Sequence, residues 1–338
     1  MAIKKLGKQT VKLENPPSIV STASIVGSKE GQGPLKDKFD IILDDDLWGE
    51  DSWEKAESKM LENAVKLAID KGNLSPDEID YMFGGDLLNQ IISASFAARQ
   101  LSIPFFGLYG ACSTMTESLS LASMIIDGGY ADHCIATTSS HFAAAERQFR
   151  FPLEMGSQRA PSAQWTATAS GAALLSKEGD GPYITHVTTG KVIDFGIKDS
   201  NNMGAAMAPS AADTILRHFK DTGLQPKDYD LIITGDLGEV GKDLAIKLLK
   251  ENNLDISSNF TDCGVEIFDI KNQDVGSGAS GCGCSASVFC GHFYSLLKSG
   301  ELNKILILST GALMSPTSTL QGESIPGIAH AVAIQRRL

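Results

Sequence analysis

The spacing of hydrophobic residues changes repeatedly along the chain between the period of a strand and the period of a helix. Short apolar runs within residues 10–27 predict two opening strands. Ser52 then precedes a segment in which apolar residues recur every four positions from Ala56 to Ala68, and Gly72 follows it. This is the pattern of an amphipathic helix with an N-cap serine and a C-terminal glycine. Strands that alternate with helices in this way predict an α/β protein.

A twelve-residue segment occurs twice and indicates an internal duplication. Residues 76–87 and residues 226–237 match at an offset of 150, with identical Pro, Asp, Gly, Asp and Leu at five positions. Each copy follows an amphipathic helix and continues into a predicted strand. We therefore expect two βαβαβ-type halves, residues 1–178 and 179–338, built from parallel strands with right-handed crossovers.

The segment around Cys112 is the strongest candidate for a functional site. An apolar run at residues 103–108 predicts a buried strand, and residues 113–126 predict a helix with a single charge, Glu117. Cys112 lies between the two, at the first turn of the helix. A helix N-terminus lowers the pKa of a thiol and offers backbone N–H groups to an anion. The position therefore suits either a nucleophilic cysteine or the docking site of a carboxylate ligand.

The second half contains a segment similar to this one, with Cys282 ahead of a predicted helix that ends at Lys298. Asp86 and Asp236 follow equivalent strands of the two halves. In α/β sheets, ligands bind at the carboxyl ends of strands. Cys112, Cys282 and the two aspartates are therefore expected to face one shared cleft. The alternative for the aspartates is a role as caps or turn formers, which is common for an aspartate after a glycine.

Charge and composition exclude several classes of function. The formal net charge is −12, which argues against nucleic acid as a partner. No apolar run is long enough to cross a membrane, and the N-terminus lacks the apolar core of a signal peptide. The six cysteines do not have the spacing of a disulfide framework, and those at 282, 284 and 290 do not have that of a zinc site. We expect a reducing compartment, no metal and no cofactor.

A duplicated α/β chain with a cysteine at the start of a buried helix resembles the thiolase superfamily, which includes β-ketoacyl synthase III. Longer motifs, spread along nearly the whole chain, narrow the resemblance to the stage V sporulation protein AD family of spore-forming Firmicutes. These motifs include Phe83-Gly-Gly-Asp-Leu-Leu-Asn-Gln90, Leu108-Tyr-Gly-Ala-Cys-Ser-Thr114, Ala145-Glu-Arg-Gln-Phe-Arg-Phe-Pro152, Met203-Gly-Ala-Ala-Met-Ala-Pro209 and Gly276-Ser-Gly-Ala-Ser-Gly-Cys-Gly-Cys-Ser285.

The resemblance implies a thiolase-like fold with α-β-α-β-α layers, and a homodimer. It also implies a role without catalysis, namely binding of dipicolinic acid (pyridine-2,6-dicarboxylate), alone or as its calcium chelate, and its uptake into the developing spore during sporulation. The implied partners are the membrane proteins of the stage V sporulation A complex. A chain without a membrane segment would lie peripherally at the forespore inner membrane through these partners.

The residues that condensing enzymes of this superfamily require are missing. Condensation needs a base that activates the thiol and neutral donors that hold the thioester oxygen. Residues 234–239 and 281–284 occupy the positions where β-ketoacyl synthase III has its histidine and asparagine, and they contain neither; the Gly-His-Pro motif of thiolases is also absent. An aspartate at the cleft would raise the pKa of the thiol. We expect condensation to be disabled, with acyl transfer by Cys112 as the alternative function.

A dicarboxylate ligand requires cationic side chains and an apolar slot. We place dipicolinate between Cys112, His141 and the pair formed by Arg147 and Arg150, because arginine can bind a carboxylate through two parallel hydrogen bonds. His141 would add a third contact in its cationic form. The alternatives are a structural role for His141, and ion pairs of the two arginines with nearby glutamates or a dimer partner.

Overall fold

The structure is a computed structural model that describes residues 4–149 and 159–338. Its helices are α1 (Trp53–Lys71), α2 (Ile92–Leu101), α3 (Thr114–Asp127), α4 (Phe142–Phe149), α5 (Met203–Thr222), α6 (Gly238–Glu251), α7 (Cys263–Glu266), α8 (Cys282–Val288), α9 (Tyr294–Ser299) and α10 (Pro316–Leu320). Its strands are β1 (Thr10–Lys12), β2 (Ser18–Val26), β3 (Ile41–Ile42), β4 (Tyr81–Gly85), β5 (Phe105–Gly107), β6 (His133–Ser140), β7 (Trp165–Thr166), β8 (Ala169–Ser176), β9 (Tyr183–Thr188), β10 (Leu231–Thr234), β11 (Phe260–Asp262), β12 (Ala279–Ser280), β13 (Lys304–Ala312) and β14 (Gly327–Gln335).

The main strands form two half-sheets of matching topology. The order is β2-β8-β6-β4-β5 in the first half and β9-β14-β13-β10-β11 in the second. In each half the last three strands are parallel, whereas β8 and β14 run antiparallel to their neighbours. One register pair, Ser18 with Tyr183, joins β2 to β9. The strand-by-strand correspondence confirms the internal duplication, and the antiparallel strands make each half-sheet mixed rather than all-parallel.

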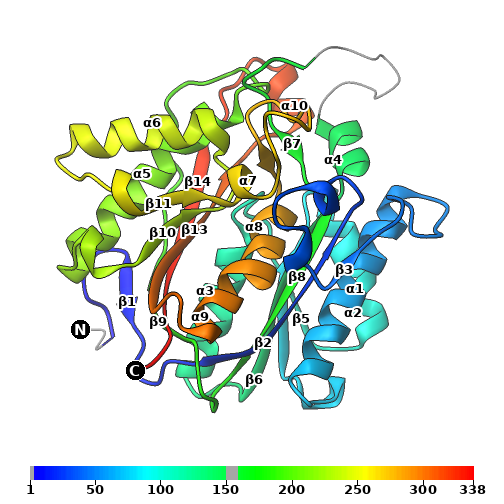
Figure 1. Ribbon diagram of the computed structural model, residues 1–338, viewed down its shortest axis with the longest axis vertical. Helices are drawn as coiled ribbons and strands as arrows, with labels where there is room; N and C mark the ends of the chain where they lie inside the picture. The colour runs from blue at the N-terminus through cyan, green and yellow to red at the C-terminus, as the bar shows by residue number, and fades with distance from the viewer. Residues whose placement is uncertain (1–3, 150–158) are drawn as a thin grey trace.

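Helices cover both faces of the two half-sheets and produce five layers (Figure 1). The middle layer contains α3 and α8, and α3 packs against β4 and β6 of the first half and against β13 and β14 of the second. The helices α1 and α2 cover the outer face of the first half-sheet, and α5 and α6 cover that of the second. The predicted α-β-α-β-α arrangement is therefore confirmed. It places the start of α3, where Cys112 lies, between the two halves.

Helix α1 shows how local signals produce an element. Ser52 has an extended backbone, and its hydroxyl accepts a hydrogen bond from the N–H of Lys55 at 3.4 Å. The apolar residues that recur every four positions, Ala56, Met60, Ala64 and Ala68, are fully buried, and the helix packs against the first half-sheet. Gly72 ends the helix, and its N–H donates to the carbonyl oxygen of Ala68. The predicted start, end and buried face are all confirmed.

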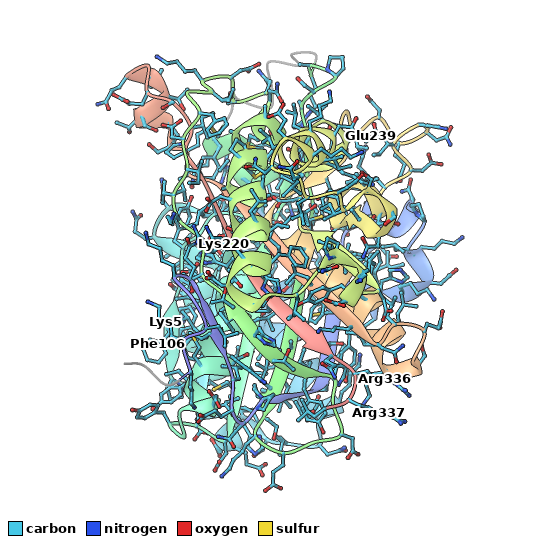
Figure 2. All side chains as sticks on the ribbon, turned by 90° about the vertical axis from the view of Figure 1, so that its left-hand side faces the viewer. Lys5, Phe106, Lys220, Glu239, Arg336 and Arg337 are labelled. Carbon is cyan, nitrogen blue, oxygen red and sulfur yellow. The ribbon has the colours of Figure 1, made fainter. Side chains whose placement is uncertain are left out.

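Strand β5 differs from the prediction of a buried strand. It is the edge strand of the first half-sheet, and Phe106 is 49% exposed. Figure 2 shows Phe106 at the surface of the molecule. An apolar run fits a buried strand and a partly covered edge strand equally well, because both need residues that pack on a pleated surface. The position in the sheet order decides between them.

The duplicated segments retain the same local hydrogen bonds. Pro76–Glu78 and Pro226–Asp228 each form a short 3-10 turn with proline at its start. The Asp80 carboxylate accepts two backbone N–H groups at the entry to β6, and the Asp230 carboxylate accepts two at the entry to β13. Each aspartate therefore fixes the start of the strand next to its own.

In the part of the chain that the structure describes, no helix has both the length and the apolar character that crossing a bilayer would require.

Candidate functional site

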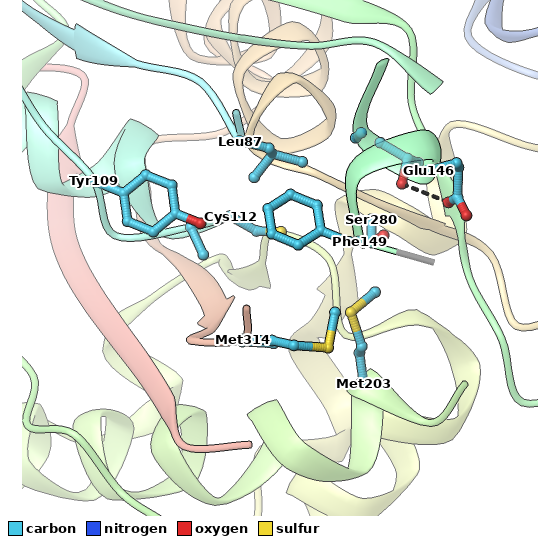
Figure 3. Close-up of a pocket in the computed structure, with 12 residues that line it drawn as sticks. Leu87, Tyr109, Cys112, Glu146, Phe149, Met203, Ser280 and Met314 are labelled. Atoms are coloured by element: carbon cyan, nitrogen blue, oxygen red, sulfur yellow. Dashed lines mark hydrogen bonds between the residues drawn. The ribbon is translucent and has the colours of Figure 1, made fainter. Parts of the chain in front are cut away.

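A narrow cavity lies beside Cys112, with walls from both halves of the chain (Figure 3). The cavity opens to solvent, and the atom-free space counted together with the solvent at its mouth amounts to about 440 Å³. Most of the wall is apolar or aromatic, with a few polar groups. The lining residues are Leu87, Tyr109, Ala111, Cys112, Ala145, Glu146, Phe149, Thr166, Met203, Ser280, Ala312 and Met314. This composition is typical of a site for a small ligand that is held by its ring or chain and oriented by a few polar contacts.

Cys112 lies in the tight turn between β5 and α3. The residue before it, Ala111, has a left-handed backbone with φ of 51°, a conformation that residues with a side chain rarely adopt. The N–H groups of Ser113 and Thr114 donate to the carbonyl oxygens of Gly110 and Ala111. These two N–H groups at the helix start are therefore engaged within the turn, and the structure does not offer them to an anion.

The thiol of Cys112 faces the buried carboxyl group of Asp236. The two side chains are hydrogen-bonded, and the Thr310 hydroxyl donates to Oδ1 of Asp236 at 2.7 Å. Burial raises the pKa of the Cys112 thiol well above its usual range, and Asp236 raises it further. Burial likewise raises the pKa of Asp236 to about 7. Near neutral pH, Cys112 is therefore a protonated thiol rather than the thiolate that nucleophilic catalysis needs.

Among the lining residues that the structure describes, the one carboxylate belongs to Glu146 of α4, whose side chain is 3% exposed. Its Oε2 lies 2.9 Å from Nη2 of Arg159, and its Oε1 accepts a hydrogen bond of 2.9 Å from the Thr166 hydroxyl (dashed in Figure 3). Sequence reasoning missed both Glu146 and Arg159 as site residues. The only available signal was the clustering of arginines after His141, which does not show which of them pairs with a residue of the cavity wall.

The structure does not bring His141 or Arg147 to the cavity. His141 is fully buried, with Nε2 2.7 Å from the carbonyl oxygen of Asp46, and burial lowers its pKa, so its imidazole is neutral near pH 7. Arg147 forms an ion pair with Glu54, away from the lining residues. Arg150, the other arginine of the expected pair, lies outside the described residues.

Cys282 and Asp86 lie near the cavity, but neither is part of its wall. The Cys282 thiol donates to the carbonyl oxygen of Ser139 at 2.9 Å, and its side chain packs in a small apolar cluster with Cys112. The Asp86 carboxylate accepts two backbone N–H groups at 2.7 Å each, one of them in the first turn of α2. The structure therefore brings Cys112, Cys282 and Asp236 together, and it gives Asp86 the role of a helix cap.

All six cysteines are free and buried. Across residues 4–149 and 159–338, no three His, Cys, Asp or Glu side chains are placed so that together they could hold a metal ion.

Comparison with known proteins identifies the family. The family model for stage V sporulation protein AD matches residues 7–335. The stage V sporulation protein AD of Bacillus subtilis (strain 168) is 46% identical over 334 residues, which cover 99% of this chain and 98% of the relative. The chain belongs to the stage V sporulation protein AD family. The family indicated by the sequence motifs is thereby confirmed, and the chain is a sporulation protein.

Solved structures of a 3-oxoacyl-[acyl-carrier-protein] synthase III and of OleA share the fold. The 3-oxoacyl-[acyl-carrier-protein] synthase III from Aquifex aeolicus VF5 has a TM-score of 0.58 at 14% identity, covering 94% of this chain and 99% of that one. Cerulenin-bound OleA from Xanthomonas campestris has a TM-score of 0.60 at 14% identity, covering 95% of this chain and 96% of that one. At such identities the likeness establishes a thiolase-like fold and carries no conclusion about activity.

Proposed function

We propose that this chain binds dipicolinate without catalysis, in the cavity beside Cys112, and that it takes part in dipicolinate uptake into the developing spore. Membership of the stage V sporulation protein AD family supports the sporulation role. The cavity supports the binding role, because it is narrow and its wall is largely apolar.

The observation that carries the non-catalytic part is the partner of the Cys112 thiol. A condensing enzyme needs a group that removes the thiol proton, whereas Asp236 and burial both favour the protonated form of Cys112. No histidine of the described chain lines the cavity, so a base of the usual kind is missing from its wall. The site therefore supports binding better than acyl transfer.

The shape and polarity of the cavity favour a flat aromatic ligand. Phe149, Met203 and Met314 give it apolar walls, and Tyr109 adds a second ring (Figure 3). An aromatic ring between such side chains gains contact area and sulfur–aromatic contacts. A calcium ion held between the two ligand carboxylates would neutralise their charge. Such a chelate fits a wall with few polar groups, so the proposal covers the free acid and the calcium chelate.

Calorimetric titration tests the binding role. Wild-type protein should bind dipicolinate saturably at one site per chain. Ala145→Phe, which places a ring inside the cavity, should abolish binding, and Val192→Phe, at a position that is 55% exposed and outside the cavity wall, should leave it unchanged. Absence of binding at millimolar dipicolinate would refute the proposal. Mass spectrometry after incubation with acyl-CoA tests the alternative, because an acyl adduct on Cys112 that turns over would establish an acyltransferase.

For the uptake role we expect the chain to act with the membrane proteins of the stage V sporulation A complex, and to assemble as a homodimer. The edge strand β5 supports the dimer, since among the described strands it pairs with β4 alone and it presents the exposed Phe106. Light scattering should give the mass of a dimer for the wild type and of a monomer for Phe106→Glu. A monomeric wild type would refute the dimer, and failure of the complex proteins to co-purify with the chain would refute the partnership.

A further inference from the structure

We infer that Arg159 is the residue that binds a carboxylate of the anionic ligand, and that Glu146 competes with the ligand for it. This inference rests on the proposed function, because it takes the cavity beside Cys112 as the ligand site. The cationic contact expected at Arg147 is thereby assigned to Arg159 instead, because Arg159 forms an ion pair with Glu146, a residue of the cavity wall.

Arg159 is held from several sides. Its Nη2 pairs with Glu146 at 2.9 Å, and its Nη1 donates to the carbonyl oxygen of Gln164 at 2.7 Å. The guanidinium lies 4.9 Å from the ring centroid of Trp165 and 5.1 Å from that of Phe142, and these two rings stack on each other at 3.9 Å. Stacking on aromatic faces orients the plane of an arginine side chain. The cation is therefore pre-positioned before a ligand arrives.

Within the described residues, the cavity wall has no cation of its own. No lysine, arginine or histidine of the described chain lines the cavity, and its one wall carboxylate belongs to Glu146. A ligand carboxylate next to an unpaired Glu146 would meet a like charge. Arg159 removes that repulsion through its ion pair. Lys29 adds a second positive charge near the same ring, with Nζ 4.0 Å from the centroid of Trp165.

Arg159 also has hydrogen-bonding capacity to spare. A guanidinium has five N–H donors. Within the described residues, the structure shows one of its terminal nitrogens on Glu146 and the other on the Gln164 carbonyl oxygen. The side chain of Arg159 is 28% exposed, so it is not fully buried by its protein partners. A ligand carboxylate can therefore bind the guanidinium while Glu146 stays in place, and the two carboxylates then share one cation.

If the ligand and Glu146 share the cation of Arg159, substitutions of Arg159 and of Glu146 should change the affinity for dipicolinate in opposite directions. Arg159→Ala should weaken dipicolinate binding about tenfold to a hundredfold, the range for loss of a hydrogen bond to a charged group. Arg159→Lys should lie between this variant and the wild type, because lysine keeps the charge without the paired geometry. Glu146→Gln should strengthen binding severalfold, because it frees the cation and still accepts the Thr166 hydroxyl. Arg217→Ala serves as the matched control.

The control is matched in surroundings as well as in residue type. Arg217 of α5 pairs with Asp221 and has a side chain that is 22% exposed, close to the value for Arg159, but it lies outside the cavity wall. Its substitution should leave the affinity within twofold of the wild type. Calorimetry at fixed ionic strength measures all four variants, and thermal unfolding without ligand reports their stability.

A purely structural ion pair would produce a different pattern. Arg159→Ala and Glu146→Gln would then lower the melting temperature and the affinity together. The inference is overturned if Glu146→Gln weakens binding, or if Arg159→Lys and Arg159→Ala both keep the wild-type affinity. If the wild type binds dipicolinate and these outcomes occur, only the inference fails. If the wild type does not bind, the proposed function fails and the inference falls with it.

Discussion

The buried carboxyl group of Asp236 makes the stability of this protein depend on pH in a defined direction. Burial raises its pKa from an ordinary value of 3.8 to about 7, so the folded chain binds this proton more tightly than the unfolded chain does. A group with a raised pKa contributes stability that is complete below its unfolded pKa and is lost as the pH rises through its folded pKa. Asp236 should therefore destabilise the fold progressively from about pH 4 to above pH 7.

The size of the effect follows from the two pKa values. Applied between pH 5 and pH 8, the linkage relation gives a loss of about 2–3 kcal/mol in the free energy of unfolding from this one group. Asp236→Asn removes the titration but keeps an oxygen that can accept the hydrogen bond from Thr310. Relative to the wild type, this variant should therefore gain about 2–3 kcal/mol between pH 5 and pH 8.

Urea unfolding of both proteins at the two pH values measures this difference, provided that the transitions are two-state. The comparison between variant and wild type cancels the contribution of a buried carboxyl group that does not interact with Asp236, such as Glu30, whose pKa burial raises to about 8. Asp243→Asn, at an exposed position of α6, should track the wild type at both pH values. If Asp236→Asn and the wild type lose stability in parallel from pH 5 to pH 8, the pKa of the Asp236 carboxyl group is not raised in the way described.

Three further predictions follow from single contacts. Because its pKa is raised, Cys112 should be alkylated by iodoacetamide at least about tenfold more slowly than free cysteine at pH 8, as followed by mass spectrometry; an equal rate would contradict this. Asp80→Ala and Asp230→Ala should each lower the free energy of unfolding by about 1–2 kcal/mol, because each substitution removes two hydrogen bonds from backbone N–H groups. If urea unfolding gives very different losses for the two variants, the duplicated turns are not equivalent. Gly283→Ala should cost about 1–3 kcal/mol, since its Cβ would lie 2.2 Å from the carbonyl oxygen of Ala169, and an unchanged melting temperature would argue against this close approach.

Several features of the fold were accessible from local sequence. The start and end of α1 follow from Ser52 and Gly72, and its buried face follows from apolar residues every four positions. The duplication was visible because both copies keep the aspartate that fixes the next strand. These features depend on contacts within a few residues or on periodicity, so the sequence encodes them directly.

Which arginine contacts a residue of the cavity wall was less accessible. Arg147 and Arg159 are both arginines close to α4, but Arg147 turns outward to Glu54, whereas Arg159 packs on two aromatic rings and pairs with Glu146. Which direction each takes depends on how β7 and α4 pack together. No spacing rule within the sequence reports that packing.

The two equivalent aspartates of the duplication, Asp86 and Asp236, show which features the sequence predicts and which only the tertiary structure decides. Local pattern was enough to put Asp86 and Asp236 at the carboxyl ends of matching strands and Cys112 at the turn into α3, because strand and helix periods set those positions. Asp86 then caps a helix in its own half, while in the second half Asp262 accepts the backbone N–H groups after Asp236 and leaves Asp236 to meet Cys112. That meeting joins residues of different halves across the middle layer, so it exists only once the two half-sheets have packed against each other.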